Sequence, residues 1–176
     1  VGGIVPSAKG QLVIPPTARE NTLLRLLSAV VELQPEQAAA PTAGASDAAI
    51  ERLAHLAHPG SLVLLLSDFQ QISTAADPAL QALSLHNDLI FGFLYDPLEG
   101  TPPPAGNYPI TNRESSWSVN TQESSIKAQW AHRFESHREA TQSLCRRHRG
   151  HWMEVSTDDS LPHTLQLGLQ RRHRPR

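Results

Sequence analysis

Two aspartates follow apolar runs that are predicted to be buried strands. Leu62–Leu66 is followed by Ser67 and Asp68, and Leu89–Tyr95 is followed by Asp96. Unbroken apolar runs joined by a helical crossover are typical of neighbouring parallel strands buried on both faces. Ligands of open α/β sheets bind outside the carboxyl ends of such strands. The two carboxylates could hold Mg²⁺ for hydrolytic or phosphatase-like chemistry, or they could simply cap turns and helices.

Composition restricts the classes of partner. The chain has 176 residues, enough for one domain with a sizeable core, and a formal net charge of −2. This charge balance gives no general attraction to nucleic acids or membranes. Basic residues gather at the end of the chain, but no aromatic residues alternate with them. We therefore predict a solvated basic tail over residues 171–176, with no role in nucleic-acid binding.

Cysteine usage and hydropathy indicate a cytoplasmic protein. Cys145 is the only cysteine, so no internal disulfide can form, which suits a reducing compartment. Its place near the end of a predicted helix favours a structural role. No apolar stretch is long enough to span a bilayer, and no secretory signal opens the sequence. Because the chain starts at Val1 inside an apparent strand, we expect that something precedes this residue.

Strand and helix patterns alternate along the chain. Ser46 and Asp47 are predicted to cap the second helix. The predicted elements are a hairpin over 4–14, helices from 21 and 46, a strand at 62, a helix around 80–83, a strand at 89, a hairpin over 108–120, a helix over 122–148, a strand at 152 and a helix from 161. This order predicts a three-layer α/β fold with a mostly parallel sheet, forming one domain over residues 1–170.

Several motifs together carry a family resemblance. They include Pro59–Phe69, which contains the strand and its Ser-Asp-Phe ending, Phe93–Glu99 with Asp-Pro-Leu-Glu, and Val155–Asp159. In these motifs and their order, the chain resembles the C-terminal part of the bacterial domain-of-unknown-function fifty-eight family, which is von Willebrand factor A-like. The resemblance implies a Rossmann-like three-layer sheet, truncated here at the N-terminus.

The resemblance also implies a metal-ion-dependent adhesion site that holds Mg²⁺ or Mn²⁺. Such a site uses an Asp-x-Ser-x-Ser loop, a threonine and a later aspartate, because hard cations prefer oxygen ligands. Asp68 matches the later aspartate, Thr22 is the candidate threonine and Thr17 is its alternative. Ser67 and Asp96 are expected to line the binding surface. The Asp-x-Ser-x-Ser motif is absent, so we expect a partial site that holds no cation tightly.

The family architecture places a further strand between the strands at Ile4 and Leu62. That strand and its helix would lie before Val1. A strand buried on both faces needs hydrogen-bonding neighbours along both edges. We therefore expect the 176-residue chain to be poorly stable by itself, or its two strands to collapse together.

By resemblance, the leading functional hypothesis is a non-catalytic protein-binding and assembly module, with a MoxR-class AAA ATPase as partner. The first alternative is a Mg²⁺-dependent α/β hydrolase or phosphatase-like enzyme that uses Asp68 and Asp96. The second is a gene fragment without a function of its own. A zinc site at His137, His148 and His151 lacks the usual ligand spacing, so these histidines are predicted to be solvated.

Overall fold

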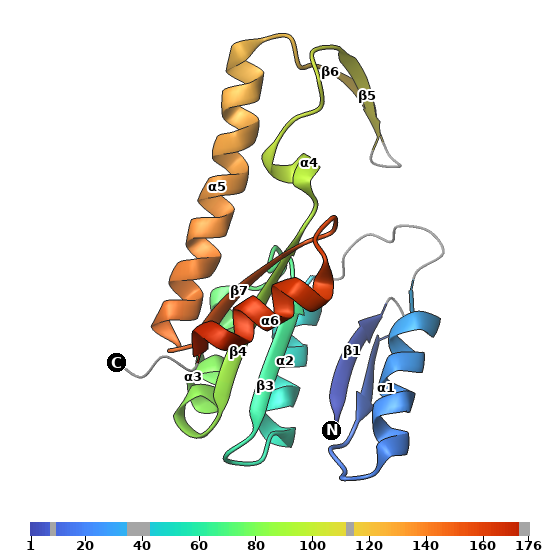
Figure 1. Ribbon diagram of the computed structural model, residues 1–176, viewed down its shortest axis with the longest axis vertical. Helices are drawn as coiled ribbons and strands as arrows, with labels where there is room; N and C mark the ends of the chain where they lie inside the picture. Colours follow the sequence, from blue (N-terminus) through green and yellow to red (C-terminus); the bar gives the residue numbers. More distant parts are fainter. Residues whose placement is uncertain (8–9, 35–42, 112–114, 173–176) are drawn as a thin grey trace. The chain divides into compact units, whose positions relative to one another are not determined.

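The computed structural model describes residues 1–7, 10–34, 43–111 and 115–172. The elements are β1 (Gly3–Ser7), β2 (Gly10–Ile14), α1 (Glu20–Glu32), α2 (Ala45–Leu56), β3 (Leu62–Ser67), the short 3₁₀ helix η1 (Thr74–Ala76), α3 (Asp77–His86), β4 (Asp88–Tyr95), α4 (Pro97–Gly100), β5 (Asn107–Thr111), β6 (Ser116–Asn120), α5 (Ser124–Arg147), β7 (His151–Ser156) and α6 (Leu161–Arg172) (Figure 1). The predicted order of strands and helices is confirmed. Residues 173–176 of the predicted tail lie outside the described residues.

The chain forms two compact units. The first comprises Val1–Leu65, Phe69–Ile90 and His148–Gly150. The second comprises Leu66–Asp68, Phe91–Arg147 and His151–Arg176. The expectation of a single domain over residues 1–170 stays a prediction.

The main sheet is parallel and has the strand order β3-β4-β7. β4 lies in the middle, and its residues Leu89, Ile90, Phe91 and Phe93 are all at most 4% exposed. The prediction that this strand is buried on both faces is therefore confirmed. A central strand needs this composition, since both of its faces are covered and both of its edges are paired. The fold is α/β, with helices flanking the sheet, as the sequence predicts.

The prediction that the Leu62 strand is buried on both faces is wrong. β3 is an edge strand of the three-stranded sheet. Val63 is 5% exposed, whereas Leu62, Leu64 and Leu66 are 56%, 48% and 56% exposed. Successive side chains of a strand point to opposite faces, so the structure covers one face of β3 and leaves a row of leucines on the other.

In the first unit, β1 and β2 form an antiparallel hairpin whose register runs from Gly3↔Ile14 to Ser7↔Gly10. α1 packs on this hairpin. The packing is close at Gly3, where a Cβ atom would lie 2.7 Å from Cδ1 of Leu26. Thr22 and Ala29 share the buried side of the helix. The rest of α1 is unusually apolar for an exposed surface: Leu23, Leu24, Leu27, Val30 and Val31 are 44–67% exposed.

Asp47 does not cap α2, which corrects the sequence-based expectation. Gly44 precedes the helix with φ of 74°, and no side chain caps the helix start. Asp47 is buried, and its two carboxylate oxygens accept hydrogen bonds from the backbone N (2.9 Å) and the hydroxyl (2.6 Å) of Ser73. The Asp47 carboxylate therefore accepts hydrogen bonds from Ser73 instead of from the backbone N–H groups at the start of α2. These two bonds connect α2 to the segment that begins η1.

The prediction that the histidines are solvated is wrong for His148. Its side chain is 3% exposed, and its Nε2 atom lies 3.1 Å from Oδ1 of Asp77, the first residue of α3. Arg149, the next residue, adopts a left-handed φ of 55° where the chain leaves α5. The imidazole of His148 is therefore part of the packing of the first unit.

In the second unit, an aromatic cluster packs α5 against the sheet. The Phe93 ring centre lies 5.4 Å from that of Trp152, 5.7 Å from that of His137 and 6.1 Å from that of Phe134. Phe134 also lies 5.4 Å from Tyr95. These rings come from β4, β7 and α5, so they pack the helix against both strands.

A buried threonine closes the base of the β5–β6 hairpin, whose register runs from Asn107↔Asn120 to Thr111↔Ser116. Thr121 is 1% exposed. Its hydroxyl donates to the carbonyl oxygen of Pro104 (2.7 Å) and accepts from the backbone N of Gly106 (3.0 Å). One hydroxyl therefore satisfies two backbone groups of the preceding loop.

We predict that Thr121→Val destabilises the chain by about 1–3 kcal/mol, because it keeps the shape of the buried side chain but removes the hydroxyl that pairs with the backbone of Pro104 and Gly106. Urea denaturation followed by circular dichroism measures the change. Thr111→Val is the matched control, since Thr111 is exposed at the other end of the hairpin. A surface substitution of this kind changes stability by less than about 0.5 kcal/mol. Equal losses in the two variants would contradict the prediction.

Candidate functional site

The carboxyl ends of β3, β4 and β7 carry polar side chains, and all of these side chains belong to the second unit. At the end of β3, the hydroxyl of Ser67 donates to Oδ1 of exposed Asp68 at 3.3 Å. The Nε2–H of His137 donates to the backbone oxygen of Asp68 at 2.7 Å. Phe69 then turns the chain with a left-handed φ of 58° while its side chain is buried. Few residues other than glycine adopt this conformation. The backbone of the turn after Asp68 is therefore unusual for a bulky residue.

At the end of β4, Asp96 caps the short helix α4. Its Oδ1 accepts from the backbone N of Leu98 at 2.8 Å, and the Glu99 carboxylate accepts from the backbone N of Asp96 at 3.0 Å. This reciprocal pair is a capping box. The interpretation of Asp96 as a helix cap is therefore confirmed, which leaves its functional role as a separate question.

The end of β7 is bonded both to its own turn and to β4. The backbone N of Ser156 donates to Asp159 at 3.1 Å, and its hydroxyl donates to Asp158 at 2.6 Å. The backbone N of Thr157 donates to the carbonyl oxygen of Tyr95 at 3.0 Å, and the Thr157 hydroxyl lies 3.3 Å from Oδ2 of Asp96. These bonds hold the ends of two neighbouring strands together.

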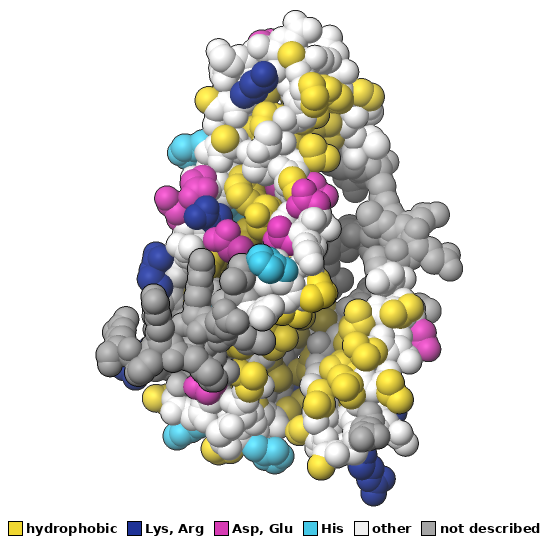
Figure 2. Space-filling view, viewed as in Figure 1, with side chains coloured by type: hydrophobic (Ala, Val, Ile, Leu, Met, Phe, Trp, Pro, Cys, Tyr) yellow, Lys and Arg dark blue, Asp and Glu magenta, His cyan; other side chains and the backbone are white. Residues whose placement is uncertain are grey.

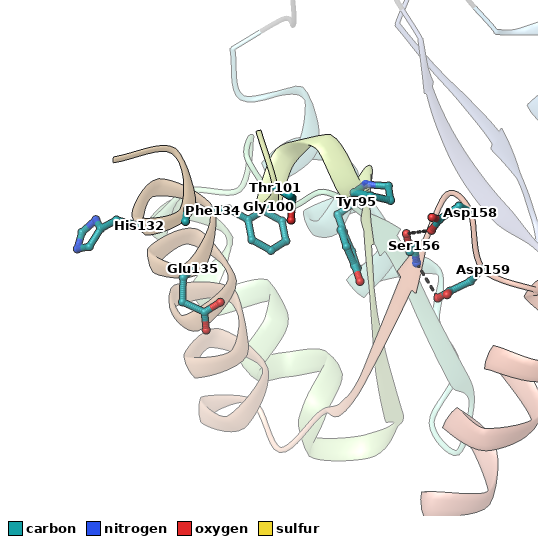
Figure 3. A pocket seen from close by; sticks show the side chains of 11 residues that line it. Tyr95, Gly100, Thr101, His132, Phe134, Glu135, Ser156, Asp158 and Asp159 are labelled. Atoms are coloured by element: carbon teal, nitrogen blue, oxygen red, sulfur yellow. Dashed lines mark hydrogen bonds between the residues drawn. The ribbon is translucent and has the colours of Figure 1, made fainter. Parts of the chain in front are cut away.

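A pocket of about 760 Å³ opens beside these ends. Figure 3 shows the Tyr95 ring between Phe134 and the group formed by Ser156, Asp158 and Asp159. Thr101 also lines the pocket. The pocket thus combines aromatic rings with carboxylates whose positions are set by hydrogen bonds to Ser156.

The environment of Tyr95 keeps its phenol protonated. Burial is the largest cause that raises the pKa of Tyr95, and the negative charges of Glu154, Asp159 and Asp158 act in the same direction. A hydrogen bond with Ser156 opposes them. Tyr95 therefore brings a neutral hydroxyl, able to donate a hydrogen bond, to a pocket with acidic side chains.

The two threonines considered for the metal site are neighbours in the first unit. Thr22 lies in the first turn of α1 and is 6% exposed, and its hydroxyl is hydrogen-bonded to the hydroxyl of Thr17. Asp68 belongs to the second unit. In the part of the chain that the structure describes, no group of three or more His, Cys, Asp or Glu side chains is arranged to hold a metal ion.

Part of this site is predictable from the sequence. Ser67, Asp68 and Asp96 are expected there because they follow apolar strands. Tyr95 and the turn over 156–159 are not among the predicted site residues, although the turn also follows a predicted strand. Applying the same rule to the third strand would have found this turn. Phe134 had no comparable signal, because a helical aromatic residue usually belongs to the core.

These features define an α/β protein with a parallel three-stranded sheet and a polar pocket at the carboxyl ends of its strands. A family model described as "Protein of unknown function DUF58" matches residues 1–140. The chain therefore belongs to the DUF58 family. The search of curated proteins and the search of solved structures each gave no match. Within the described residues, none of the helices has the length and apolar character needed to cross a bilayer.

Cys145 is the only thiol in the chain, and it lies inside the protein instead of at this pocket. Its side chain is 1% exposed. Burial raises the pKa of Cys145 to about 11, while the neighbouring charge of Arg146 acts in the opposite direction. The thiolate is the reactive form of cysteine, so these features confirm the predicted structural role.

We predict that Cys145 in the folded chain reacts with a disulfide reagent at about pH 8 at least a hundredfold more slowly than in urea-unfolded chain. Its contribution to stability is complete below about pH 9 and is lost as the pH rises towards 11, because the unfolded thiol releases its proton first. Absorbance of the released thiol follows the labelling. Comparable rates in the folded and unfolded chain would contradict the assignment.

Proposed function

We propose that this chain is a non-catalytic protein-binding and assembly module that binds its partner at the carboxyl edge of the sheet. The main support is the pocket of about 760 Å³ beside Tyr95, Ser156 and Asp158. The loops around it are cross-linked by the hydrogen bonds of Asp96 and Thr157. A surface that is ordered before binding loses less conformational entropy when a partner docks.

The chemistry of the pocket favours a partner that presents a basic side chain. The faces of Tyr95 and Phe134 offer cation–π contacts. Asp158 and Asp159 supply complementary negative charge at the same pocket. We propose a MoxR-class AAA ATPase as this partner, on the basis of the resemblance to von Willebrand factor A-like domains.

A divalent cation enters the proposal only for a longer protein that contains this chain. In such a protein, Asp68 and Thr22 would be this chain's oxygen ligands for Mg²⁺ or Mn²⁺. Magnesium requires about six oxygen ligands, including water. The Thr22 hydroxyl already pairs with Thr17. The residues described here therefore do not fit a site that holds the ion tightly without further ligands.

The alternative of a Mg²⁺-dependent hydrolase that uses Asp68 and Asp96 gains no support from the contacts of Asp96. Both carboxylate oxygens of Asp96 accept hydrogen bonds, one from Leu98 and one from Thr157. The gene-fragment alternative stays a prediction.

We predict that Thr101→Arg weakens binding to the MoxR-class ATPase encoded in the same genome by at least about tenfold, because the new cation occupies the acidic pocket. Biolayer interferometry with the purified ATPase measures the affinity. Thr74→Arg is the matched control, because Thr74 is exposed in η1 of the first unit. If both variants bind like the unchanged chain, the pocket is not the docking site.

We also predict that Mg²⁺ leaves the Tm of this chain unchanged. A ligand raises the Tm only when its concentration exceeds its Kd for the folded state, and the partial site is expected to bind Mg²⁺ weakly. Differential scanning fluorimetry with and without MgCl₂ tests this. Asp68→Ala serves as the comparison. A rise in Tm that disappears in Asp68→Ala would show that the chain holds the cation by itself, and would contradict the partial site.

A further inference from the structure

The carboxylates of Asp158 and Asp159 each keep one oxygen that no other group of the protein uses. Oδ1 of Asp158 accepts from the Ser156 hydroxyl at 2.6 Å, and Oδ2 of Asp159 accepts from the Ser156 backbone N at 3.1 Å. Within the described part of the chain, the second oxygen of each carboxylate accepts no hydrogen bond, and neither carboxylate forms an ion pair. Both side chains are exposed and line the pocket. The turn over 156–159 therefore presents two acceptors with uncompensated negative charge.

The third acidic side chain of the pocket already has a cationic partner. Glu135 lines the pocket, and its Oε2 atom lies 3.3 Å from the guanidinium of Arg138. Among the described residues that line the pocket, none is a lysine or an arginine. A cation that enters the pocket is therefore attracted mainly to Asp158 and Asp159.

An aromatic wall stands beside these two carboxylates. The ring centres of Tyr95 and Phe134 lie 5.4 Å apart, and the rings are inclined by 51°. Gly100 lets α4 approach Phe134 closely, since a Cβ atom there would lie 3.2 Å from two carbons of the ring, inside the optimal contact distance. Figure 2 shows acidic side chains beside hydrophobic ones where α5 and the end of β7 lie. A ligand in this pocket thus meets ring faces and carboxylate oxygens together.

Arginine matches this combination better than lysine does. Its guanidinium is planar, carries five N–H donors in a fixed arrangement and is weakly hydrated. It can donate to two neighbouring carboxylates while its flat face covers an aromatic ring. The lysine ammonium is a compact, strongly hydrated charge without a flat face. It therefore gains the charge attraction but not the stacking.

We propose that the pocket selects an arginine side chain of the partner over a lysine side chain. In the complex, the guanidinium donates hydrogen bonds to Oδ2 of Asp158 and Oδ1 of Asp159, and its face lies on the ring of Tyr95. These three side chains are then the specificity-determining residues of the site. This inference rests on the proposed function, because it names the chemical group that the partner inserts into the same pocket.

Titration of the full 176-residue chain with amino-acid amides tests the selection. The probes are N-acetyl-arginine amide, N-acetyl-lysine amide and N-acetyl-citrulline amide, of which the last has the shape of arginine without its charge. ¹H–¹⁵N NMR spectra report binding at the backbone amides of residues 156–159. We expect the arginine probe to bind with a Kd at least about fivefold below that of the lysine probe, and the citrulline probe to cause no saturable shift. Equal Kd values for arginine and lysine, equal binding of citrulline, or no arginine binding at these amides overturns the proposal.

A double variant that removes both charges tests the two carboxylates. Asp158→Asn combined with Asp159→Asn keeps side-chain oxygens that can accept the hydrogen bonds from Ser156. It should bind the arginine probe at least about tenfold more weakly. Glu32→Gln combined with Glu139→Gln is the matched control, because it removes two charges from exposed positions of α1 and α5 outside the pocket. A loss of the same size in the two double variants overturns the proposal.

Tyr95→Leu tests the ring separately, because it leaves both carboxylates in place. It should bring the Kd values of the arginine and lysine probes within about twofold of each other. A preference for arginine that is unchanged in this variant overturns the role of Tyr95 in the selection.

The ATPase measurement distinguishes this inference from the proposed function. Equal arginine and lysine affinities, together with ATPase binding that Thr101→Arg weakens, overturn only the arginine selection. Arginine selection in a chain that does not bind the ATPase supports this inference and overturns only the proposed partner.

Discussion

The need of β4 for hydrogen-bonding partners on both edges organises the candidate site. Its buried run includes Phe91 and Phe93, at 0% and 1% exposure. Backbone groups in such a strand have no access to water and must pair with neighbouring strands. β3 and β7 supply these partners in the order β3-β4-β7. Because the three strands are parallel, Asp68, Asp96 and Ser156 come to the same edge of the sheet.

Short-range hydrogen bonds then convert this edge into an ordered surface. Asp96 caps α4, while Asp158 and Asp159 fix the turn after β7 through Ser156. These hydrogen bonds give the edge a defined shape and charge. Together with the ring of Tyr95, they form the surface at which we propose that a partner binds.

The exposed apolar side chains of β3 and α1 show that the position of a segment in the fold, and not its composition, decides which of its side chains are buried. The leucines of β3 resemble those of β4 in sequence, yet the edge position leaves Leu62, Leu64 and Leu66 about half exposed. α1 shows the same effect, since it buries Ala29 on the hairpin and exposes Leu24 and Val31. The free energy of the system falls when another protein surface covers such apolar side chains.

The amino-acid sequence by itself determined the order of the elements, the ends of the strands and hence the positions of Asp68 and Asp96, because periodicity, glycine and proline act locally. Only the tertiary structure decided that β3 lies at an edge, that Asp47 bonds to Ser73 and that His148 bonds to Asp77. These pairs are 26 and 71 residues apart. No local sequence pattern encodes such contacts. Packing of the fold brings the two partners together, and their hydrogen bonds are then more favourable than those available from residues nearby in the sequence.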